Sequence, residues 1–396
     1  MRVLLVSRGV FPVPPKHSAG AELHGYNLAN ALAQLGHEIH YVTDITENGT
    51  FHRNVIIHTI KSPLFSSYAN FGSWILSHII GNIRAFRSAF NALKFERFRF
   101  DVIHGHGNLS SLLLLNFRKG VPLIYTMHDP TPYMCSYPSW QEHAIRQASF
   151  KCVDLSLWHR ADHIVVVSNA LKKELVRWGV SPQKISVIFS GVDTEFLKRN
   201  DDCVSPRVKA KYGIKGRYCL FVGRLTLRKG INYLLRALVE TNITCVIVGE
   251  GPQRDDLILL ANRLGIKGKV IFTGYVPKSD LKEVYAGASF FVFPSLADVG
   301  VTLTILEALS TGLPVIATDI PGTGEIVRDG YNGFLIPPRR DVEALRSKIQ
   351  LLVDNTELCK KMGMEARRTV GRKFSWHSVA EKTITVYESL CNRRNQ

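Results

Sequence analysis

Cysteine is scarce in this chain and never occurs in a metal-binding or redox pair. The 396 residues include seven cysteines, scattered from Cys135 to Cys391 without any CxxC spacing. An odd number without ligand spacing argues against a disulfide scaffold and against a zinc module. The cysteine content is typical of reduced thiols in a cytoplasmic protein.

Long apolar segments are also lacking. The nearest candidate, residues 62–83, carries no formal charge but is interrupted by Ser, Asn and His, so it is too polar to cross a lipid bilayer. The apolar run at the start of the chain is too short for a secretion signal. We expect a cytoplasmic protein without a membrane-spanning segment.

Acidic residues are outnumbered. The chain has 33 Asp and Glu against 50 Lys and Arg, a formal net charge of +17. Such a surface favours anionic partners: nucleic acid, a phosphorylated ligand or an acidic membrane face. The net charge is +8 over residues 1–200 and +9 over the remainder, without a run of like charges. This even spread argues against a nucleic-acid-binding protein.

Short runs rich in Val and Ile alternate with helical patterns, as parallel sheets covered on both faces require. Strands are expected at residues 2–6, 38–43, 55–60, 101–104, 122–126 and 163–168, and again, after a pause that follows residues 187–188, at 218–222, 244–248, 270–273, 290–293 and 314–317. Helices are expected at 21–35, 342–353, 357–370 and 376–391. The alternation predicts an α/β fold with two Rossmann-like, doubly wound domains facing across a cleft.

A pause in this pattern predicts the domain boundary. Residues 193–216 are charged and have little apolar periodicity, so we interpret them as the linker. An N-terminal domain over residues 1–192 and a C-terminal domain over 193–375 follow. Ligands of doubly wound sheets bind beyond the carboxyl ends of the strands, which is where functional residues are sought.

A glycine and two cations follow the first strand of the C-terminal half. Gly223 lets the backbone approach a ligand, and Arg224 and Lys229 are presented just beyond it. Guanidinium and ammonium groups bind phosphate oxygens. The alternative, solvated cations in a first helical turn, is disfavoured because Lys and Arg prefer helix carboxyl ends.

A small-residue loop follows the strand at 290–293 and leads into a helix beginning near Thr302. Its first residues, including Leu303 and Thr304, would offer free N–H groups to an anion such as a diphosphate. Glu307, about one turn into that helix, suits the helix dipole. It would equally accept two hydrogen bonds from a ribose diol, and the neighbouring cations favour that second interpretation.

Three features of the N-terminal half are weaker indications of a ligand site. Gly20 lies between the first strand and the first helix, where it would admit a ligand close to the backbone. His128 follows the strand at 122–126 and could donate to a sugar hydroxyl or a leaving oxygen, although a lone histidine is more often structural. His104 and His106 alternate after a strand, but no third metal ligand is evident, so no metal site is predicted.

In combination these motifs resemble family 4 of the retaining glycosyltransferases, which have the GT-B fold. The C-terminal half carries Gly223-Arg224-Leu225, Lys229-Gly230, Gly249-Glu250-Gly251-Pro252, Gly274-Tyr275-Val276, Leu306-Glu307-Ala308, Gly312-Leu313-Pro314-Val315 and residues 325–333. The N-terminal half agrees through Ala19-Gly20-Ala21-Glu22, Leu35-Gly36-His37-Glu38, residues 101–104, 166–168 and 191–193. The resemblance covers essentially the whole chain.

The resemblance implies a nucleotide-sugar donor held by the C-terminal domain. Arg224 and Lys229 would bind the diphosphate, Glu307 the ribose, and the backbone near Val276 the base. From the N-terminal domain His128 would approach the donor sugar, and the loop at Gly20 would help to close over the phosphates. The family retains the anomeric configuration and needs no bound metal or cofactor. Its last helix, here 376–396, commonly returns to the first domain.

The sequence departs from the family pattern at one important place. The family usually carries two glutamates eight positions apart; the second matches Glu307, but the first position is Val299. That glutamate normally contacts the donor sugar, and Val299 cannot accept a hydrogen bond. The neighbouring Asp298 could take over if the loop shifts; otherwise the donor sugar differs, or the protein is a catalytically silent nucleotide-sugar-binding partner subunit.

Residues 64–100 alternate aromatic and basic side chains. Ile79, Ile83, Phe86, Phe90 and Leu93 fall at helical spacing, and residues 61–99 carry a net charge of +5. The favoured interpretation is an amphipathic helix whose apolar side packs on the sheet of its own domain. The alternative is an interfacial surface that touches anionic lipid or a lipid-linked acceptor.

The sequence therefore predicts a retaining, hexosyltransferase-type glycosyltransferase. Its acceptor would be a lipid-linked or glycan acceptor, and the protein would be cytoplasmic, with the inner face of a membrane as a possible peripheral site. A soluble sugar acceptor is the alternative. A Rossmann dehydrogenase is disfavoured because the first strand–helix loop lacks GxGxxG.

Overall fold

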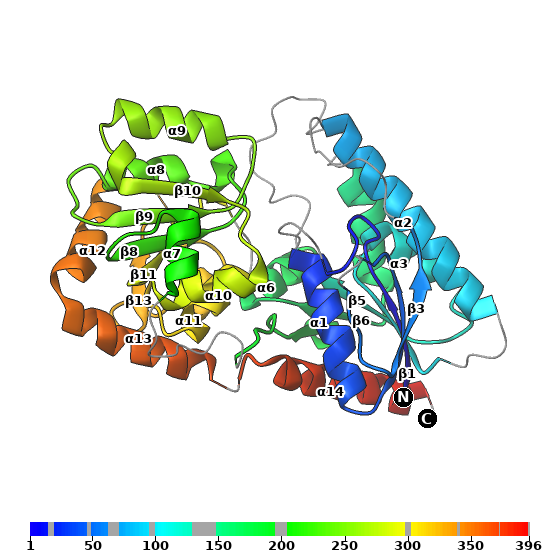
Figure 1. Ribbon diagram of the computed structural model, residues 1–396. Helices are drawn as coiled ribbons and strands as arrows, with labels where there is room; N and C mark the ends of the chain where they lie inside the picture. Colours follow the sequence, from blue (N-terminus) through cyan, green and yellow to red (C-terminus); the bar gives the residue numbers. More distant parts are fainter. Residues whose placement is uncertain are drawn as a thin grey trace. The chain divides into compact units, whose positions relative to one another are not determined.

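The computed structural model describes residues 1–14, 20–45, 49–61, 71–94, 100–128, 148–194, 204–297, 302–338, 341–371 and 373–394. The side chains of residues 71–77 lie outside this description. The chain divides into two compact units: residues 1–190 with 376–396 form unit 1, and residues 191–375 form unit 2 (Figure 1). Each unit is built around one parallel sheet. The doubly wound α/β class predicted from the sequence is confirmed.

The sheet of unit 1 has seven strands in the order β3-β2-β1-β4-β5-β6-β7. They are β1 (Arg2–Val6), β2 (Glu38–Thr43), β3 (Val55–Thr59), β4 (Val102–Gly105), β5 (Leu123–Met127), β6 (His163–Val166) and β7 (Ile185–Val187). All neighbours pair in parallel. Central strands such as β1 and β4 are almost wholly buried, which explains their continuous apolar runs.

Helices cover both faces of this sheet. They are α1 (Gly20–Gln34), α2 (Phe71–Lys94), α3 (Asn108–Leu114), α5 (Leu155–Arg160), α6 (Asn169–Arg177) and α14 (Trp376–Arg394), with a π-helical turn η2 (Phe150–Asp154) and a 3-10 turn η3 (Pro182–Lys184). Helices α1 and α14 pack together: Leu28, Ala29 and Leu32 share one apolar cluster with Val386 and Tyr387. Helices α2 and α3 contact each other and the sheet.

The sheet of unit 2 has six strands in the order β10-β9-β8-β11-β12-β13. They are β8 (Tyr218–Val222), β9 (Thr244–Val248), β10 (Val270–Gly274), β11 (Phe290–Phe293), β12 (Val315–Thr318) and β13 (Gly333–Ile336), again paired in parallel. The core of unit 2 includes Phe221, Leu234, Ile247, Phe290 and Ile349.

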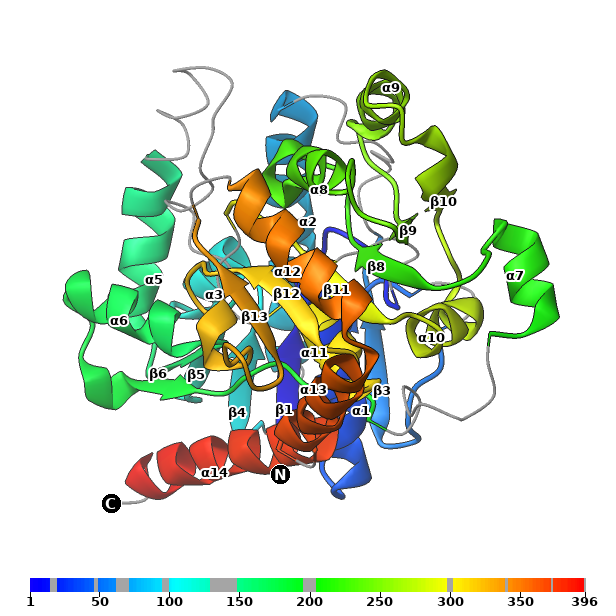
Figure 2. The same cartoon turned by 90° about the vertical axis from the view of Figure 1, so that its left-hand side faces the viewer.

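The helices of unit 2 are α7 (Pro206–Tyr212), α8 (Ile231–Ala237), α9 (Arg254–Arg263), α10 (Lys278–Ala286), α11 (Leu303–Ser310), α12 (Val342–Asp354) and α13 (Thr356–Val370), with 3-10 turns η4 (Leu227–Lys229), η5 (Lys267–Lys269) and η6 (Thr323–Glu325). Helices α8 and α12 lie side by side (Figure 2). Helix α11 packs against β11, β12 and α13.

One expectation about local structure was wrong, and two strands were missed. The last strand of unit 1, β7 at Ile185–Val187, was not predicted. Part of the expected linker forms α7, which has Ser205 as its N-cap and Pro206 at its first turn, a standard helix start. The sequence prediction also missed β13, whose first residue, Gly333, has no side chain to signal a buried strand.

The packing face of α2 also differs from the prediction. Ala85, Ala89 and Ala92 are buried, whereas Ile79 and Ile83 are 42% and 41% exposed. A close backbone approach explains the choice of small residues, because a Cβ at Gly81 would collide with the carbonyl oxygen of Gly9. The small residues Ala85, Ala89 and Ala92 of α2 therefore face its own unit, and Ile79 and Ile83 face outward.

No helix in the described part of the chain is long and apolar enough to span a membrane. Each sheet is flanked by a substantial apolar cluster within its own unit. The two units therefore have the core that each needs to fold as an α/β domain.

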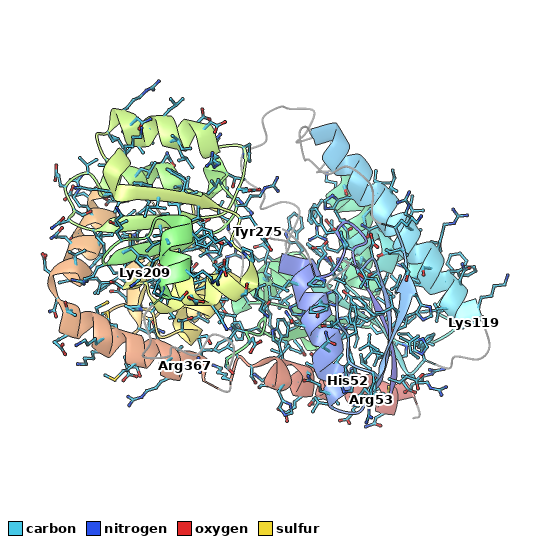
Figure 3. All side chains as sticks on the ribbon, viewed as in Figure 1. His52, Arg53, Lys119, Lys209, Tyr275 and Arg367 are labelled. Atoms are coloured by element: carbon cyan, nitrogen blue, oxygen red, sulfur yellow. The ribbon has the colours of Figure 1, made fainter. Side chains whose placement is uncertain are left out.

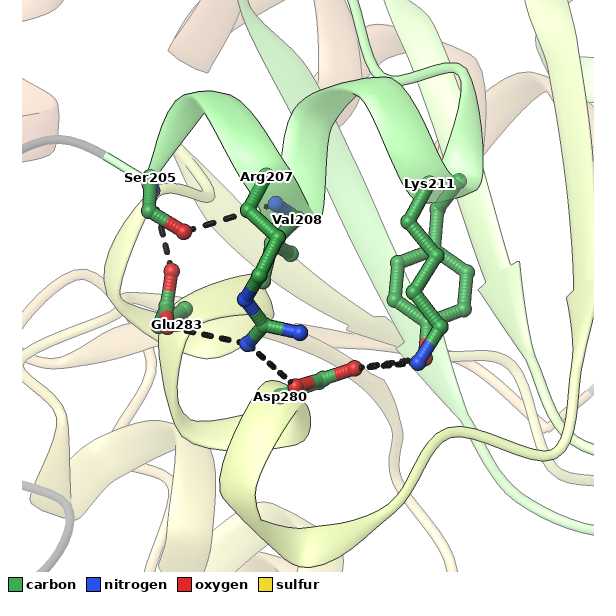
Figure 4. Close-up of polar contacts among 7 residues, drawn as sticks. Ser205, Arg207, Val208, Lys211, Asp280 and Glu283 are labelled. Atoms are coloured by element: carbon green, nitrogen blue, oxygen red, sulfur yellow. Dashed lines mark hydrogen bonds and ion pairs between the residues drawn. The ribbon is translucent and has the colours of Figure 1, made fainter.

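Two carboxylates of α10, Asp280 and Glu283, fasten α7 to α10, and Asp280 makes most of the contacts (Figure 4). Asp280 accepts hydrogen bonds from Arg207 Nη2 at 2.7 Å, Lys211 Nζ at 2.8 Å and the Tyr212 hydroxyl at 2.9 Å. The hydrogen bonds from Lys211 and Arg207 hold the pKa of Asp280 well below its usual range. The side chain of Asp280 is only 3% exposed, so this network is the buried part of the polar contact between the two helices.

We expect Asp280→Asn to lower the thermal midpoint of unfolding at neutral pH by roughly 2–6 °C, because charge-assisted hydrogen bonds weaken when the charge is removed. The folded pKa is depressed, so the stabilisation is complete above the unfolded pKa of about 3.9 and is lost as the pH falls below it. The difference between variant and wild type should narrow in that acid range. Calorimetry across pH measures both effects.

Asp255→Asn on α9 is the matched control, because the Asp255 side chain is 92% exposed and its ion pair with Arg254 is 3.8 Å long. Its midpoint should stay within about 1 °C of wild type. Equal midpoints for both variants at neutral pH would contradict the role given to Asp280.

Candidate functional site

Each sheet has one switch point, where the strand order reverses. In unit 2 it lies between β8 and β11, and in unit 1 between β1 and β4. Ligands of doubly wound sheets bind outside the carboxyl ends of the strands at such a point. The segments that follow β8 and β11, and those that follow β1 and β4, are therefore the places to examine.

The loops after β8, β9 and β11 are fastened to one another by backbone hydrogen bonds. Leu225 N–H donates to the Glu250 carbonyl at 2.9 Å, and Leu296 N–H donates to the Arg228 carbonyl at 2.8 Å. The segment from Gly223 to Gly230 is thus held between its two neighbours. This holds the predicted phosphate-binding loop in one conformation.

Glycine is required where these loops meet. Gly249 has φ +131°, and a Cβ there would collide with the carbonyl oxygen of Gly223. Gly230 has φ +66°, and a Cβ there would collide with the carbonyl oxygen of Pro294. Only glycine fits such positions, so these residues bring the three loops together.

The two predicted phosphate cations lie on this held segment. Arg224 is exposed directly after β8 and Gly223, and Lys229 is partly buried in η4. The Lys229 ammonium lies 5.1 Å from the centroid of the Phe293 ring, at the end of β11. Both cations therefore lie at the switch point of the sheet.

Helix α11 follows the loop after β11, so it begins from the same carboxyl edge of the sheet. Thr302 is its N-cap residue in an extended conformation, and Leu303 and Thr304 are its first helical residues. Their N–H groups have no partners within the helix. The Thr302 hydroxyl is buried and has no hydrogen-bond partner in the described residues. A helix amino end at the edge that also carries two cations suits an anionic ligand.

Glu307 follows in the second turn of α11 and is partly buried. The Tyr285 hydroxyl, from α10, donates to Glu307 Oε2 at 2.8 Å. Burial raises the pKa of Glu307 to about 7, against the lowering effects of the Tyr285 hydrogen bond and of Lys278. The carboxyl group is therefore balanced between its neutral and ionised forms at physiological pH.

The end of β10 carries the residues predicted to approach a base. Val276 is buried, whereas Tyr275, labelled in Figure 3, is 49% exposed. The Gly274 carbonyl accepts a hydrogen bond from Gly249 N–H at 2.9 Å. The segment after β10 is thereby joined to the loop after β9.

In unit 1, His128 belongs to a cluster of histidine rings at the ends of β4 and β5. Rings of His104 and His106 stack at 4.8 Å, and rings of His106 and His128 stack at 5.2 Å. His24, from α1, makes an edge contact with His128 at 4.9 Å. His24, His104 and His106 are buried, and His128 is partly exposed.

Hydrogen bonds orient the rings of this cluster. His104 lies 2.6 Å from the Tyr387 hydroxyl of α14 and 2.6 Å from Thr126 Oγ1, and His106 Nδ1 lies 2.9 Å from His128 Nε2. His106 Nε2 is buried and has no partner in the described residues. An unpaired buried acceptor is better tolerated than an unpaired N–H, so Nε2 of His106 carries no proton and its Nδ1–H donates to His128 Nε2. Because His128 Nε2 accepts this hydrogen bond, the proton of neutral His128 lies on Nδ1.

The remaining predicted site residues are placed as follows. Gly20 is exposed at the start of α1, and a Cβ there would meet nothing within 4 Å; its own unit does not require glycine. Asp298 and Val299 lie outside the described residues. No group of three or more His, Cys, Asp or Glu in the described ranges is placed to hold a metal ion.

Comparison with known proteins identifies the family. The model of group 1 glycosyl transferases matches residues 205–369, and that of glycosyltransferase family 4 matches residues 18–196. The chain belongs to the family 4, group 1 glycosyltransferases. It transfers a sugar from a nucleotide sugar.

Relatives of this glycosyltransferase match along its whole length. An uncharacterised glycosyltransferase of Methanocaldococcus jannaschii is 27% identical over 410 residues, covering 98% of both chains. Sucrose-phosphate synthase of Thermosynechococcus elongatus has a similar fold, with a TM-score of 0.80, 22% identity and 98% coverage of both chains. Anabaena HepE in complex with UDP-glucose has a TM-score of 0.73 and 19% identity, covering 98% of this chain and 100% of HepE. The predicted GT-B fold is confirmed.

Two residues that contact predicted site residues of this glycosyltransferase escaped the sequence analysis. His24 contacts the ring of His128, and Tyr285 binds Glu307. Neither follows a strand, and each meets a partner far away in the sequence. The hydroxyl oxygen of Ser190 lies 3.2 Å from His24 Nδ1 and so contributes to the position of the His24 ring.

The histidine cluster is neutral in the folded protein. Burial lowers the pKa of His24 to about 4 and, with the charge of His24, that of His104 to about 3. Burial, followed by repulsion from neighbouring histidines and Arg8, lowers the pKa values of His106 and His128 well below the usual range. The cluster therefore acts through hydrogen bonds rather than through positive charge.

We expect the free energy of unfolding of this glycosyltransferase to fall on acidification. Once unfolded, each imidazole regains a pKa of about 6.5, so the unfolded state binds protons that the folded state does not. The stability is complete above about pH 6.5 and is lost as the pH falls, at up to about 1.4 kcal/mol per pH unit for each histidine. For His24 the loss continues to about pH 4.

Chemical denaturation at neutral and at mildly acidic pH measures this loss, with His24→Asn as the comparison. Asn keeps a polar group facing Ser190 but does not titrate, so the variant should lose less stability on acidification than wild type. The same pH dependence in both proteins would show that His24 is not buried as a neutral ring.

Proposed function

We propose that unit 2 binds the nucleotide-sugar donor at the switch point between β8 and β11. Arg224 and Lys229 bind the diphosphate, together with the N–H groups of Leu303 and Thr304. The observation that carries this proposal is the fastening of three loops to one another, which holds both cations at the carboxyl edge of the sheet from which α11 begins. Such preorganised donors stabilise charge as it develops on a departing diphosphate.

The rest of the donor is assigned by position around that diphosphate. Glu307 accepts hydrogen bonds from the ribose, and the backbone near Val276 contacts the base, while Gly223 and Gly249 allow the loops to approach the ligand closely. From unit 1, His128 donates from Nδ1 to the donor sugar, and the loop at Gly20 covers the phosphates. The donor sugar is a hexose, as in the UDP-glucose bound by HepE, and transfer retains its anomeric configuration.

A panel of UDP-, GDP- and ADP-sugars tests the donor site. We expect one of them to raise the thermal midpoint without added metal, because a ligand that binds only the folded state stabilises it. Lys229→Ala should weaken its affinity by at least tenfold, since one charge-assisted contact contributes roughly 1.5–3 kcal/mol. Titration calorimetry measures the affinity.

Lys267→Ala is the control, because Lys267 is an exposed lysine of η5 away from the switch point. It should bind as wild type does. Equal affinity of both variants would remove Lys229 from the site. Binding of a nucleotide sugar without any transfer or hydrolysis would instead favour a catalytically silent partner subunit, the alternative that Val299 motivates.

We propose a lipid-linked acceptor at an anionic membrane surface. The support is the outer face of α2, where Ile79 and Ile83 are exposed and where the rings of Phe86 and Phe90 meet the 44%-exposed Phe117. Arg84, Arg87 and Lys94 of the same helix are exposed, as is Lys119, two residues after Phe117. Apolar side chains accompanied by cations suit a surface that lies in a lipid interface. A glycan or a soluble sugar is the alternative acceptor.

We expect the protein to sediment with vesicles that contain anionic lipid at low salt, and much less with neutral vesicles. The double variant Ile79→Ser with Ile83→Ser should reduce the bound fraction by about tenfold, because two apolar side chains no longer enter the interface. Leu259→Ser on α9 is the control, since Leu259 is 53% exposed in unit 2. Equal sedimentation with neutral and anionic vesicles would contradict the membrane surface.

A further inference from the structure

Tyr285 is a fully buried tyrosine whose hydroxyl group has a specific partner. Its ring lies on α10, 6.0 Å from the ring of Phe291 on β11, and its hydroxyl donates to Glu307 Oε2 at 2.8 Å. Burial, with the neighbouring Glu307 charge, raises the pKa of Tyr285 well above its usual value, so the hydroxyl remains a donor. The tyrosine thus fixes one of the two carboxyl oxygens.

Few other groups around the Glu307 carboxyl affect its charge state. From α10, Lys278 favours the ionised form by charge. Strands β11 and β12, which pack against α11, contain no titratable side chain. From α13, Arg367 hydrogen-bonds to Ser310 at the other end of α11. Among the described residues, the Tyr285 hydroxyl is the group that contacts the carboxyl directly.

The ionisation of Glu307 matters for a diol ligand. An ionised carboxylate offers only acceptors and can take one hydroxyl on each oxygen, whereas a protonated carboxyl turns one oxygen into a donor. Burial favours the neutral form, and a hydrogen bond to the charged form opposes it. A donor from the protein is therefore needed if Glu307 is to bind a ribose near neutral pH.

We infer that Tyr285 is a positioning residue for the donor site: its hydroxyl holds the Glu307 carboxylate in the orientation and the charge state that bind the nucleotide ribose. This inference rests on the proposed role of Glu307. It adds that nucleotide-sugar affinity depends on pH and that Tyr285 sets the midpoint of this dependence. No catalytic step is assigned to Tyr285.

The sign of the pH dependence follows from the carboxyl group. Glu307 has a pKa of about 7 in the free protein, and the ligand binds the ionised form. Affinity should therefore be full well above pH 7 and should fall by up to about tenfold per pH unit below it. The diphosphate of a nucleotide sugar is a diester without the secondary phosphate ionisation near pH 6, so the ligand does not titrate in this range.

The experiment is titration calorimetry across pH for wild type, Tyr285→Phe and Tyr218→Phe, with UDP-glucose, GDP-mannose or ADP-glucose, whichever stabilises the protein most. Tyr285→Phe should move the midpoint upward by about one pH unit, lowering the affinity at neutral pH several-fold to about tenfold. At about pH 9 its affinity should return to within about twofold of wild type.

Tyr218→Phe is the matched control. Tyr218 is also buried in unit 2, and its hydroxyl donates to the Val284 carbonyl at 2.8 Å, one residue before Tyr285. The same atom is removed beside the same helix, without any contact to Glu307. This variant should leave the midpoint unchanged, even if its thermal midpoint is lower. A second control needs no variant: the 2′,3′-dideoxy analogue of the ligand should bind wild type with little dependence on pH.

Failure of the inference and failure of the proposed function give different results. If Tyr285→Phe lowers affinity by the same factor at every pH, or not at all, Tyr285 does not set the state of Glu307 and the inference is wrong. If Glu307→Gln and the dideoxy analogue both leave affinity and its pH dependence unchanged, Glu307 is not the ribose ligand, and the proposed function fails at that residue. If no nucleotide sugar binds, the donor site itself is wrong.

Discussion

The donor side of this glycosyltransferase depends on close contact between backbones at the carboxyl edge of one parallel sheet. Gly249 lies against the carbonyl oxygen of Gly223, and Gly230 lies against that of Pro294. A single methyl group at either glycine would push the loops after β8, β9 and β11 apart, and Arg224 and Lys229 with them. The absence of a side chain at these two glycines therefore determines the position of the cations more than any contact that the cations make.

Both units also bury titratable groups and keep them uncharged or nearly so. In unit 1 the histidine cluster is neutral, and in unit 2 burial brings Glu307 close to neutrality. Protonation has opposite effects on the two charges, because acid makes the histidines of unit 1 positive and removes the negative charge of Glu307 in unit 2. Both effects are unfavourable. Acidification thus weakens the fold of one unit and the proposed ligand site of the other.

The sequence predicted eleven of the thirteen strands in the described residues, apart from shifts at their ends, and it pointed to Arg224, Lys229, His128 and Glu307 because each follows a strand or opens a helix. It missed β7, which has three residues, and β13, whose short Gly333–Ile336 run begins with a glycine. Contacts such as that of Tyr285 with Glu307 could not be predicted from the sequence. They depend on how α10 and α11 pack, and side-chain periodicity does not determine that packing.

Helix α2 shows best how a correct periodicity can lead to the wrong face. Ile79, Ile83, Phe86 and Phe90 repeat at helical spacing, and this pattern predicts that their side of the helix packs on the sheet. The contact between Gly81 and Gly9 requires small residues instead, so Ala85 and Ala89 face inward and Ile79 and Ile83 face out. The exposed Ile79 and Ile83 contribute nothing to the core of unit 1. This outward face, with its paired aromatic rings and neighbouring cations, is therefore the basis of the proposed membrane surface.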